Sequence, residues 1–291
     1  MLDQMSHFKQ RLLVGSFATF ILFIFIWLSP YPYFRPFFAL ILSFIVGGAV
    51  FEYYKIAKAK DFVPLDTIGI ICSVAYVFAV FLSTQSKAML FMPDMMLVLT
   101  GLIIFTNYFV KGPSPFANTA ITFFAIAYLA MPLACILNIT YFFPSDSTQD
   151  GRWWLVFLIM ATKMTDTGAF FIGRKYGKHK LVPYISPGKT WEGAIGGFFT
   201  ALLTSLFLYY LVNFMYENPP INLSLFHSIW LGGVLSVIAQ FGDLAESLLK
   251  RDAKVKDSST QVPGLGGMLD IVDSLVFTAP LMYIYLKIQA S

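Results

Sequence analysis

Nine long apolar runs divide this chain and leave few folds open to it. A helix needs about 20 apolar residues to cross the roughly 30 Å of a bilayer's hydrocarbon core. Proline, glycine or charged residues separate most of the runs, and no internal repeat is evident. The sequence predicts an all-α polytopic membrane protein with about nine transmembrane helices, expected at 12–29, 34–54, 67–83, 88–109, 116–138, 153–173, 191–215, 226–249 and 268–287.

The composition agrees with a membrane protein. Hydrophobic residues make up 57% of the 291 residues and charged residues only 12%, and the mean hydropathy is +0.70. Soluble domains carry about 25% charged residues. The first run follows the basic stretch HFKQRLL and has no small-x-small cleavage site after it, so we expect a retained helix rather than a signal peptide.

The positive charges favour one orientation in the membrane. With a cytoplasmic N-terminus, 15 of the 20 lysines and arginines fall in cytoplasmic segments, four fall outside, and Lys163 lies within the sixth run. Cytoplasmic loops of membrane proteins are enriched in these residues. We therefore expect the N-terminus to be cytoplasmic and the C-terminus to lie outside.

Topology does not explain the acidic residues that lie within or at the ends of apolar runs: Asp166, Asp243, Glu246, Asp270 and Asp273. A charge deep in a bilayer costs at least about 2.5–3.5 kcal/mol on insertion scales, so such a residue is usually paired, solvated or functional. All five lie near the side that we expect to be cytoplasmic.

Spacing places four of these acids on two helix faces. Asp243 and Glu246 are three residues apart, as are Asp270 and Asp273. Two acidic stripes that face one another repel unless a cation lies between them, and carboxylates with few nearby Cys or His suit Mg²⁺ better than zinc. Salt bridges inside the membrane and an ion path through a transporter are the open alternatives.

A basic segment, GRKYGKHKLVPYISPGKTWEG at 173–193, forms a second cluster. Lysine and arginine neutralise phosphate oxygens, while hydroxyls and loop amides donate to them, so the segment favours phosphate binding. Its PGKT is not a Walker A motif, because Pro183 stands where that motif needs glycine. The alternative is a basic cytoplasmic loop. Gly193 and Gly197 form a GxxxG pattern that is typical of helix packing.

The third element is PGLGG at 263–267, directly before the last run. Glycines allow a backbone to approach a ligand closely, and a helix N-terminus offers N–H groups and a positive dipole end. The alternative is a simple turn and helix start, where Asp270 suits the dipole. Acids for a metal, a cationic segment and this turn together indicate phosphoryl or nucleotidyl transfer on a lipid.

These residues resemble the phosphatidate cytidylyltransferase (CDP-diacylglycerol synthase) family. The family signature runs approximately S-x-x-K-R-x4-K-D and then P-G-H-G-G-x-x-D-R-x-D-S. The likeness covers about residues 160–280, including TDTGAFFIGRKYGKHKL and ISPGKTWEGAIGG. Two positions depart from the signature, with Leu265 in place of its histidine and Ile271 in place of its arginine. The matching residues are Ser247, Lys250, Arg251, Lys256, Asp257, Pro263, Gly264, Gly266, Gly267, Asp270, Asp273 and Ser274.

The resemblance implies which residues carry the chemistry. The expected catalytic residues are Asp243, Lys250, Asp270 and Asp273, and the expected ligands of Mg²⁺, with K⁺ as a second cation in the family's arrangement, are Asp243, Asp270, Asp166 and Asp273. The residues expected to bind substrate are Arg174, Ser186, Lys189, Thr190, Glu192, Ser247, Arg251, Lys256, Asp257, Gly264, Gly266 and Gly267.

The resemblance also implies the reaction and its setting. CTP and phosphatidate would give CDP-diacylglycerol and pyrophosphate at the cytoplasmic face of a bacterial inner membrane, in a homodimer, with the bilayer and no nucleic acid as partner. We expect residues 1–150 to form a scaffold of about five helices with a lipid or dimer surface. Residues 151–291 would then form about four catalytic helices with cytoplasmic loops. A lipid kinase that uses CTP or ATP is a further alternative.

Overall fold

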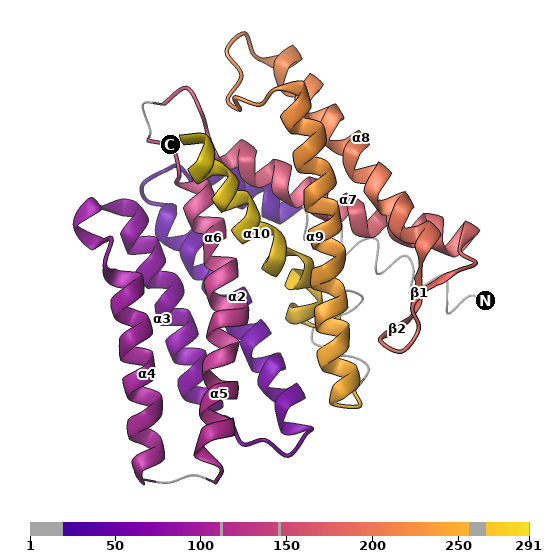
Figure 1. Ribbon diagram of the computed structural model, residues 1–291. Helices are drawn as coiled ribbons and strands as arrows, with labels where there is room; N and C mark the ends of the chain where they lie inside the picture. Colours follow the sequence, from indigo (N-terminus) through magenta and orange to yellow (C-terminus); the bar gives the residue numbers. More distant parts are fainter. Residues whose placement is uncertain (1–19, 111–112, 145–146, 256–265, 291) are drawn as a thin grey trace. The chain divides into compact units, whose positions relative to one another are not determined.

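The computed structural model describes residues 20–110, 113–144, 147–255 and 266–290, and most of them are helical (Figure 1). Eight helices in this part of the chain are long and apolar enough to cross a membrane. The predicted all-α polytopic fold is therefore confirmed, and eight of the nine predicted runs coincide with these helices. The first predicted run, 12–29, begins outside the described residues, and its residues 20–28 are helical.

The chain forms two compact units, which are described separately. The first comprises Met1–Asn138 and Leu249–Val272, and the second comprises Ile139–Leu248 and Asp273–Ser291. Helices α9 and α10 each pass from one unit into the other along the chain. The predicted division at residue 150 into a scaffold and a catalytic half is a functional one and stays a prediction.

The first unit is built from apolar helices. Its core lies along α2, where Val46, Ala49 and Val50 are fully buried and the Tyr54 hydroxyl donates to the Thr122 carbonyl at 2.8 Å. The run at 116–138 is one span that a π-helical turn, η2, interrupts. The elements are α2 (Arg35–Lys58), α3 (Asp66–Gln85), η1 (Lys87–Met89), α4 (Met92–Val110), α5 (Pro115–Ala125), η2 (Ile126–Ala130) and the start of α6 (Met131–Thr140).

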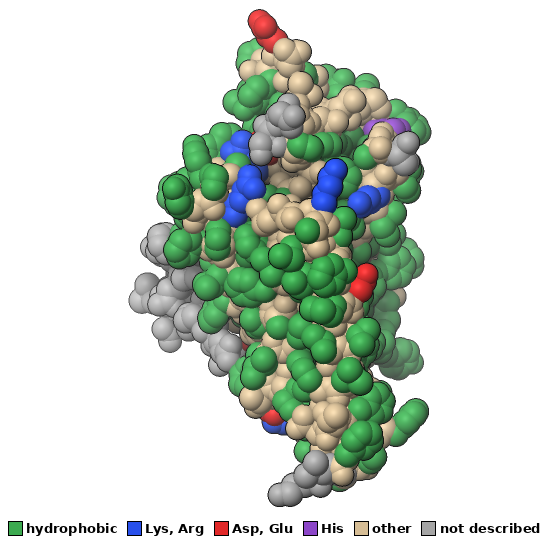
Figure 2. Space-filling model, turned by 90° about the vertical axis from the view of Figure 1, so that its left-hand side faces the viewer, with side chains coloured by type: hydrophobic (Ala, Val, Ile, Leu, Met, Phe, Trp, Pro, Cys, Tyr) green, Lys and Arg blue, Asp and Glu red, His purple; other side chains and the backbone are tan. Residues whose placement is uncertain are grey.

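Helix α4 keeps a wide apolar surface outside the core. Val98, Leu102 and Phe105 follow one another at helical spacing, and each is more than half exposed. Hydrophobic side chains likewise cover most of the face shown in Figure 2, between few charged groups. A water-soluble helix would place polar residues on such a surface, so this pattern is that of a helix which meets lipid.

The second unit holds the longest helices and a small hairpin. Helices α7 and α8 lie side by side (Figure 1). Asp150 and Thr190 cap their N-termini, since each side chain accepts a hydrogen bond from a backbone N–H of the first turn. The elements are α7 (Gly151–Tyr176), β1 (Lys180–Val182), β2 (Ser186–Thr190), α8 (Trp191–Met215), α9 (Leu225–Asp252) and α10 (Met268–Ala290).

The hairpin is the main element that sequence reasoning missed. Strands β1 and β2 pair antiparallel, with Lys180 opposite Thr190 and Val182 opposite Ser186. From sequence, the basic segment is interpreted as a loop, and no strand is predicted in it. A strand of three residues is too short to show the alternation of apolar and polar residues that identifies a strand in sequence.

Glycines let α7 and α8 approach closely. A Cβ on Gly193 would lie 2.8 Å from the Ala169 carbonyl oxygen, and one on Gly197 would lie 2.7 Å from the Thr165 carbonyl oxygen. Real side chains do not come so near a backbone atom, so a larger residue forces the two helices apart. The geometry agrees with the packing role expected of this GxxxG pair.

We predict that Gly197→Ala destabilises the protein, because the added methyl group meets the backbone of α7. The free energy of unfolding should fall by about 1–3 kcal/mol, which is typical of overpacking, and the Tm in detergent should fall with it. Gly101→Ala is the matched control, since Gly101 lies inside α4 with open space around it. An equal Tm for the two variants would contradict the packing role of Gly197.

Candidate active site

Three carboxylates from two helices meet in the second unit. Asp243 and Glu246 of α9 and Asp273 of α10 can each place one oxygen within 4.8 Å of the other two. Glu246 and Asp273 are buried, with 2% and 7% of their surfaces exposed. Oxygen donors of this kind suit a hard divalent cation such as Mg²⁺. Sequence reasoning placed Glu246 on the same face as Asp243 but did not include it among the metal ligands.

A glycine makes this meeting possible. A Cβ on Gly242 of α9 would lie 2.6 Å from the Asp273 carbonyl oxygen of α10. The two helices therefore touch at the residue that precedes Asp243, and a larger side chain there would separate the acids. The backbone N–H of Ser274 also lies 2.5 Å from Asp273 Oδ1, which holds that carboxylate against its own helix.

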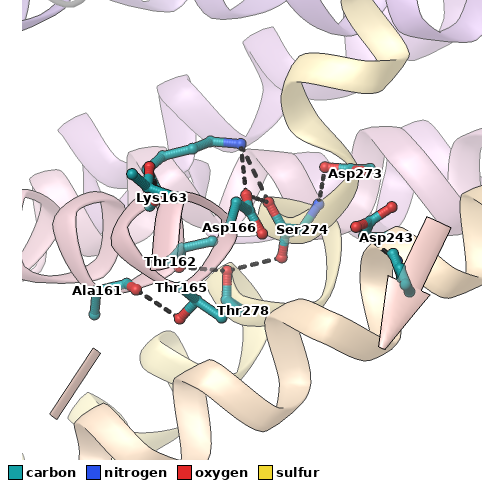
Figure 3. Close-up of polar contacts among 11 residues, drawn as sticks. Ala161, Thr162, Lys163, Thr165, Asp166, Asp243, Asp273, Ser274 and Thr278 are labelled. Atoms are coloured by element: carbon teal, nitrogen blue, oxygen red, sulfur yellow. Dashed lines mark hydrogen bonds and ion pairs between the residues drawn. The ribbon is translucent and has the colours of Figure 1, made fainter. Parts of the chain in front are cut away.

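Helix α7 adds an acid and a base beside the cluster. Ser274 Oγ donates to Asp166 Oδ2 at 3.3 Å, and Lys163 Nζ lies 3.2 Å from Ser274 Oγ and 3.6 Å from Asp166 Oδ2. Figure 3 shows Asp166 and Ser274 between Lys163 on one side and Asp243 and Asp273 on the other. Asp166, one of the predicted metal ligands, is thus placed next to the carboxylate cluster.

A pocket of about 470 Å³ opens beside these acids in the second unit. Lys189 Nζ, on the hairpin, lies 2.6 Å from Asp243 Oδ2 and so joins the basic segment to the acidic cluster. The pocket has the volume of a typical small-molecule site. Six predicted site residues line it: Asp166, Arg174, Ser186, Lys189, Thr190 and Asp243.

Glu192 has a different setting from the pocket residues. Its carboxylate accepts hydrogen bonds from the backbone N–H groups of Lys178 and His179 at 3.0–3.2 Å and lies 2.6 Å from His179 Nδ1. These contacts hold the turn between α7 and β1 against the start of α8. The contacts account for Glu192 without substrate, and its expected role in substrate binding stays a prediction.

The remaining catalytic candidates lie in the first unit. Lys250 pairs with Asp270, whose Oδ2 also accepts from the Gly267 N–H at 2.7 Å. The carboxylate of Glu52, fully buried on α2, accepts from the N–H groups of Met268 and Leu269 at 3.0 and 2.8 Å. These N–H groups at the start of α10 are therefore bonded within the chain rather than open to a phosphate.

Gly266 has a φ of +90°, a conformation that favours glycine. Ser247 is half-buried on α9, and the exposed Arg251 donates to the Val255 carbonyl at 3.4 Å. Lys256, Asp257 and Gly264, predicted to bind substrate, lie outside the described residues, as does Leu265. Whether the glycine turn contacts substrate stays a prediction.

Glu52 is a residue that sequence reasoning missed. Its signal was an acid inside the second apolar run, of the same kind that drew attention to Asp243. Its partners are backbone groups more than 200 residues away along the chain, and no local pattern identifies such a contact.

The fold and the site together define a polytopic membrane protein with an acidic cluster and a basic pocket, which suits transfer of a phosphorylated group. Residues 9–289 match the model of the cytidylyltransferase family, and the chain belongs to this family of nucleotidyl-transferring enzymes.

Two of three curated relatives match almost the whole chain. The phosphatidate cytidylyltransferase of Chlamydia muridarum (strain MoPn / Nigg) is 31% identical over 97% of this chain and 94% of its own length. The enzyme of that name from Chlamydia pneumoniae is 32% identical over 97% of this chain and 92% of its own length. That of Staphylococcus aureus (strain COL) is 35% identical over 63% of this chain and 68% of its own length. The family resemblance read from the motifs is confirmed.

We predict that Glu52→Ala lowers the Tm in detergent by about 4 °C or more, because it leaves two N–H groups at the start of α10 without their acceptor. Glu52→Gln keeps an acceptor oxygen, so its Tm should fall clearly less than that of Glu52→Ala. A wild-type Tm for Glu52→Ala would show that these bonds contribute nothing to the fold.

Proposed function

We propose that this chain transfers the cytidylyl group of CTP to phosphatidate, forming CDP-diacylglycerol and releasing pyrophosphate. Membership of the cytidylyltransferase family and relatives named phosphatidate cytidylyltransferase along nearly the full chain support this function. The structural observation that carries it is the pocket in which basic and hydroxyl side chains adjoin the acids of α7 and α9.

The chemistry needs little acid or base catalysis. An oxygen of the lipid phosphate attacks the α-phosphorus of CTP, and the bond from that phosphorus to the bridging oxygen of the leaving pyrophosphate breaks. Two anions with roughly four and two negative charges must approach each other, so charge neutralisation and positioning dominate. Arg174 and Lys189 would neutralise phosphate oxygens, and Ser186 and Thr190 would contribute polar contacts.

The carboxylates fit a divalent cation. Asp243, Glu246 and Asp273 would hold Mg²⁺, with Asp166 beside them. When bound, Mg²⁺ neutralises charge on phosphate oxygens. The expected ligation by Asp270 and the neutralisation of phosphate by Lys250 stay part of this proposal. The expected K⁺ stays a separate prediction, which the response of the wild-type enzyme to added K⁺ tests.

The lipid would reach the site from within the bilayer. Phe170 lines the pocket and is 58% exposed, which gives the pocket an apolar side for the diacylglycerol part. The charge distribution along the sequence favours a cytoplasmic site. A bacterial inner membrane and a homodimer complete the proposal.

CTP labelled at the α- or the γ-phosphate tests the reaction most simply. The purified protein with phosphatidate and Mg²⁺ should move the α-label into lipid and the γ-label into pyrophosphate. Transfer of the γ-label to lipid would instead identify a kinase. If both labels remain in CTP and the protein moves ions or another solute across sealed vesicles, it is a transporter.

Asp243→Asn should lower the rate of CDP-diacylglycerol formation by about 100-fold or more at saturating Mg²⁺, because the cluster loses a charged ligand. Asp252→Asn is the matched control, since Asp252 is an exposed acid at the end of the same helix and pairs with Lys60. Near wild-type turnover in Asp243→Asn would exclude the metal role of the cluster.

A further inference from the structure

Lys163 is a charge that topology does not require. It lies in the middle of α7, whereas the other bases of this helix, Arg152, Arg174 and Lys175, stand near its ends. The free-energy cost of inserting a lysine into a membrane span is about that of an acid. Such a lysine is therefore usually paired or functional. Its ammonium lies 3.2 Å from Ser274 Oγ and 3.6 Å from Asp166 Oδ2.

Around it, the described residues place more carboxylates than ammonium groups. Asp166, Asp243, Glu246 and Asp273 place four carboxylates in one region of the second unit. One divalent cation would offset two of these charges, and Lys189 beside Asp243 would offset a third. The ammonium of Lys163 supplies a further positive charge, and it lies beside Asp166.

The two lysines differ in what holds them. Lys189 stands on the hairpin and lines the pocket, so an incoming phosphate can compete for it. Lys163 stands on a membrane helix and contacts a buried serine of α10, and Ser274 in turn donates to Asp166. Lys163 is therefore held by groups that belong to two helices.

We propose that Lys163 is a positioning residue which acts as a built-in monovalent cation. Its ammonium offsets the charge of Asp166 and, through Ser274, holds that acid beside Asp243 and Asp273. The inference rests on the proposed function, since it assigns Lys163 to the metal-binding cluster of that reaction. Serine and carboxylate oxygens that contact an ammonium can also coordinate K⁺ or NH₄⁺, so a small cation should replace the lost charge if Lys163 is removed.

A simple ion pair is the alternative. Lys163 and Asp166 are three residues apart on one helix, and such pairs often do no more than cancel each other's cost in the membrane. In that case removal of the ammonium would lower stability, and it would change neither divalent-cation affinity nor the response to small cations.

Binding of Mn²⁺ to the nucleotide-free protein, followed by electron paramagnetic resonance, separates the two readings. Lys163→Met keeps a long apolar side chain and removes the charge. In a choline buffer we expect it to bind Mn²⁺ about tenfold more tightly than the wild type, because a neighbouring positive charge no longer repels the ion. K⁺ or NH₄⁺ at the same ionic strength should remove this gain in Lys163→Met and leave the wild type and Lys163→Arg nearly unchanged.

Turnover provides the second arm. Lys163→Met should lose about tenfold or more in CDP-diacylglycerol formation in choline and recover most of it with K⁺ or NH₄⁺, while the wild type should not respond. Lys287→Met is the matched control. Lys287 lies on α10, the helix that carries Ser274, about 21 Å along it from Asp273. Its ammonium lies over the Phe142 and Tyr283 rings. Lys287→Met should behave as the wild type in both arms.

The results that would overturn the inference are equally specific. The inference is wrong if Lys163→Met binds Mn²⁺ with the affinity of the wild type. It is also wrong if small cations do not restore the lost turnover, or if the wild-type enzyme itself needs K⁺. The binding arm uses no substrate, so it reports on Lys163 even if the wild type makes no lipid product. Such a wild-type failure would reject the proposed function alone.

Discussion

The structure depends on placing several carboxylates together inside membrane helices. Each charge is costly in hydrocarbon, and like charges at this spacing repel one another. The second unit meets this cost with close helix contacts and with bases. Gly242 lets α9 touch α10 beside Asp273, while Lys189 lies next to Asp243 and Lys163 next to Asp166. Under the proposed function, a divalent cation would offset the remaining negative charge.

Much of this arrangement was predictable, because the bilayer imposes a length and a composition on each helix. The predicted run 191–215 coincides with α8, and the run 226–249 lies inside α9. Helical spacing also correctly placed Asp243 and Glu246 on one face, and both belong to the carboxylate cluster. Motif spacing alone was enough to place the chain in its family.

The rest depends on contacts between distant parts of the chain. The bonds from Glu52 to the start of α10, the pairing of Lys189 with Asp243 and the contact of Lys163 with Ser274 each join residues that no local pattern relates. The strand β1 is too short to show periodicity. Helix length and spacing are properties of one segment, whereas these contacts are properties of the packed molecule.

The central claim is that the carboxylate cluster holds the metal that serves the reacting phosphate of CTP. Phosphorus hyperfine coupling to bound Mn²⁺, in a complex with a non-reactive CTP analogue, measures this most directly. We expect coupling to the α-phosphorus in the wild type and its loss in Asp243→Asn. The same coupling in Asp243→Asn, or Mn²⁺ bound without coupling to the nucleotide in the wild type, would contradict the claim.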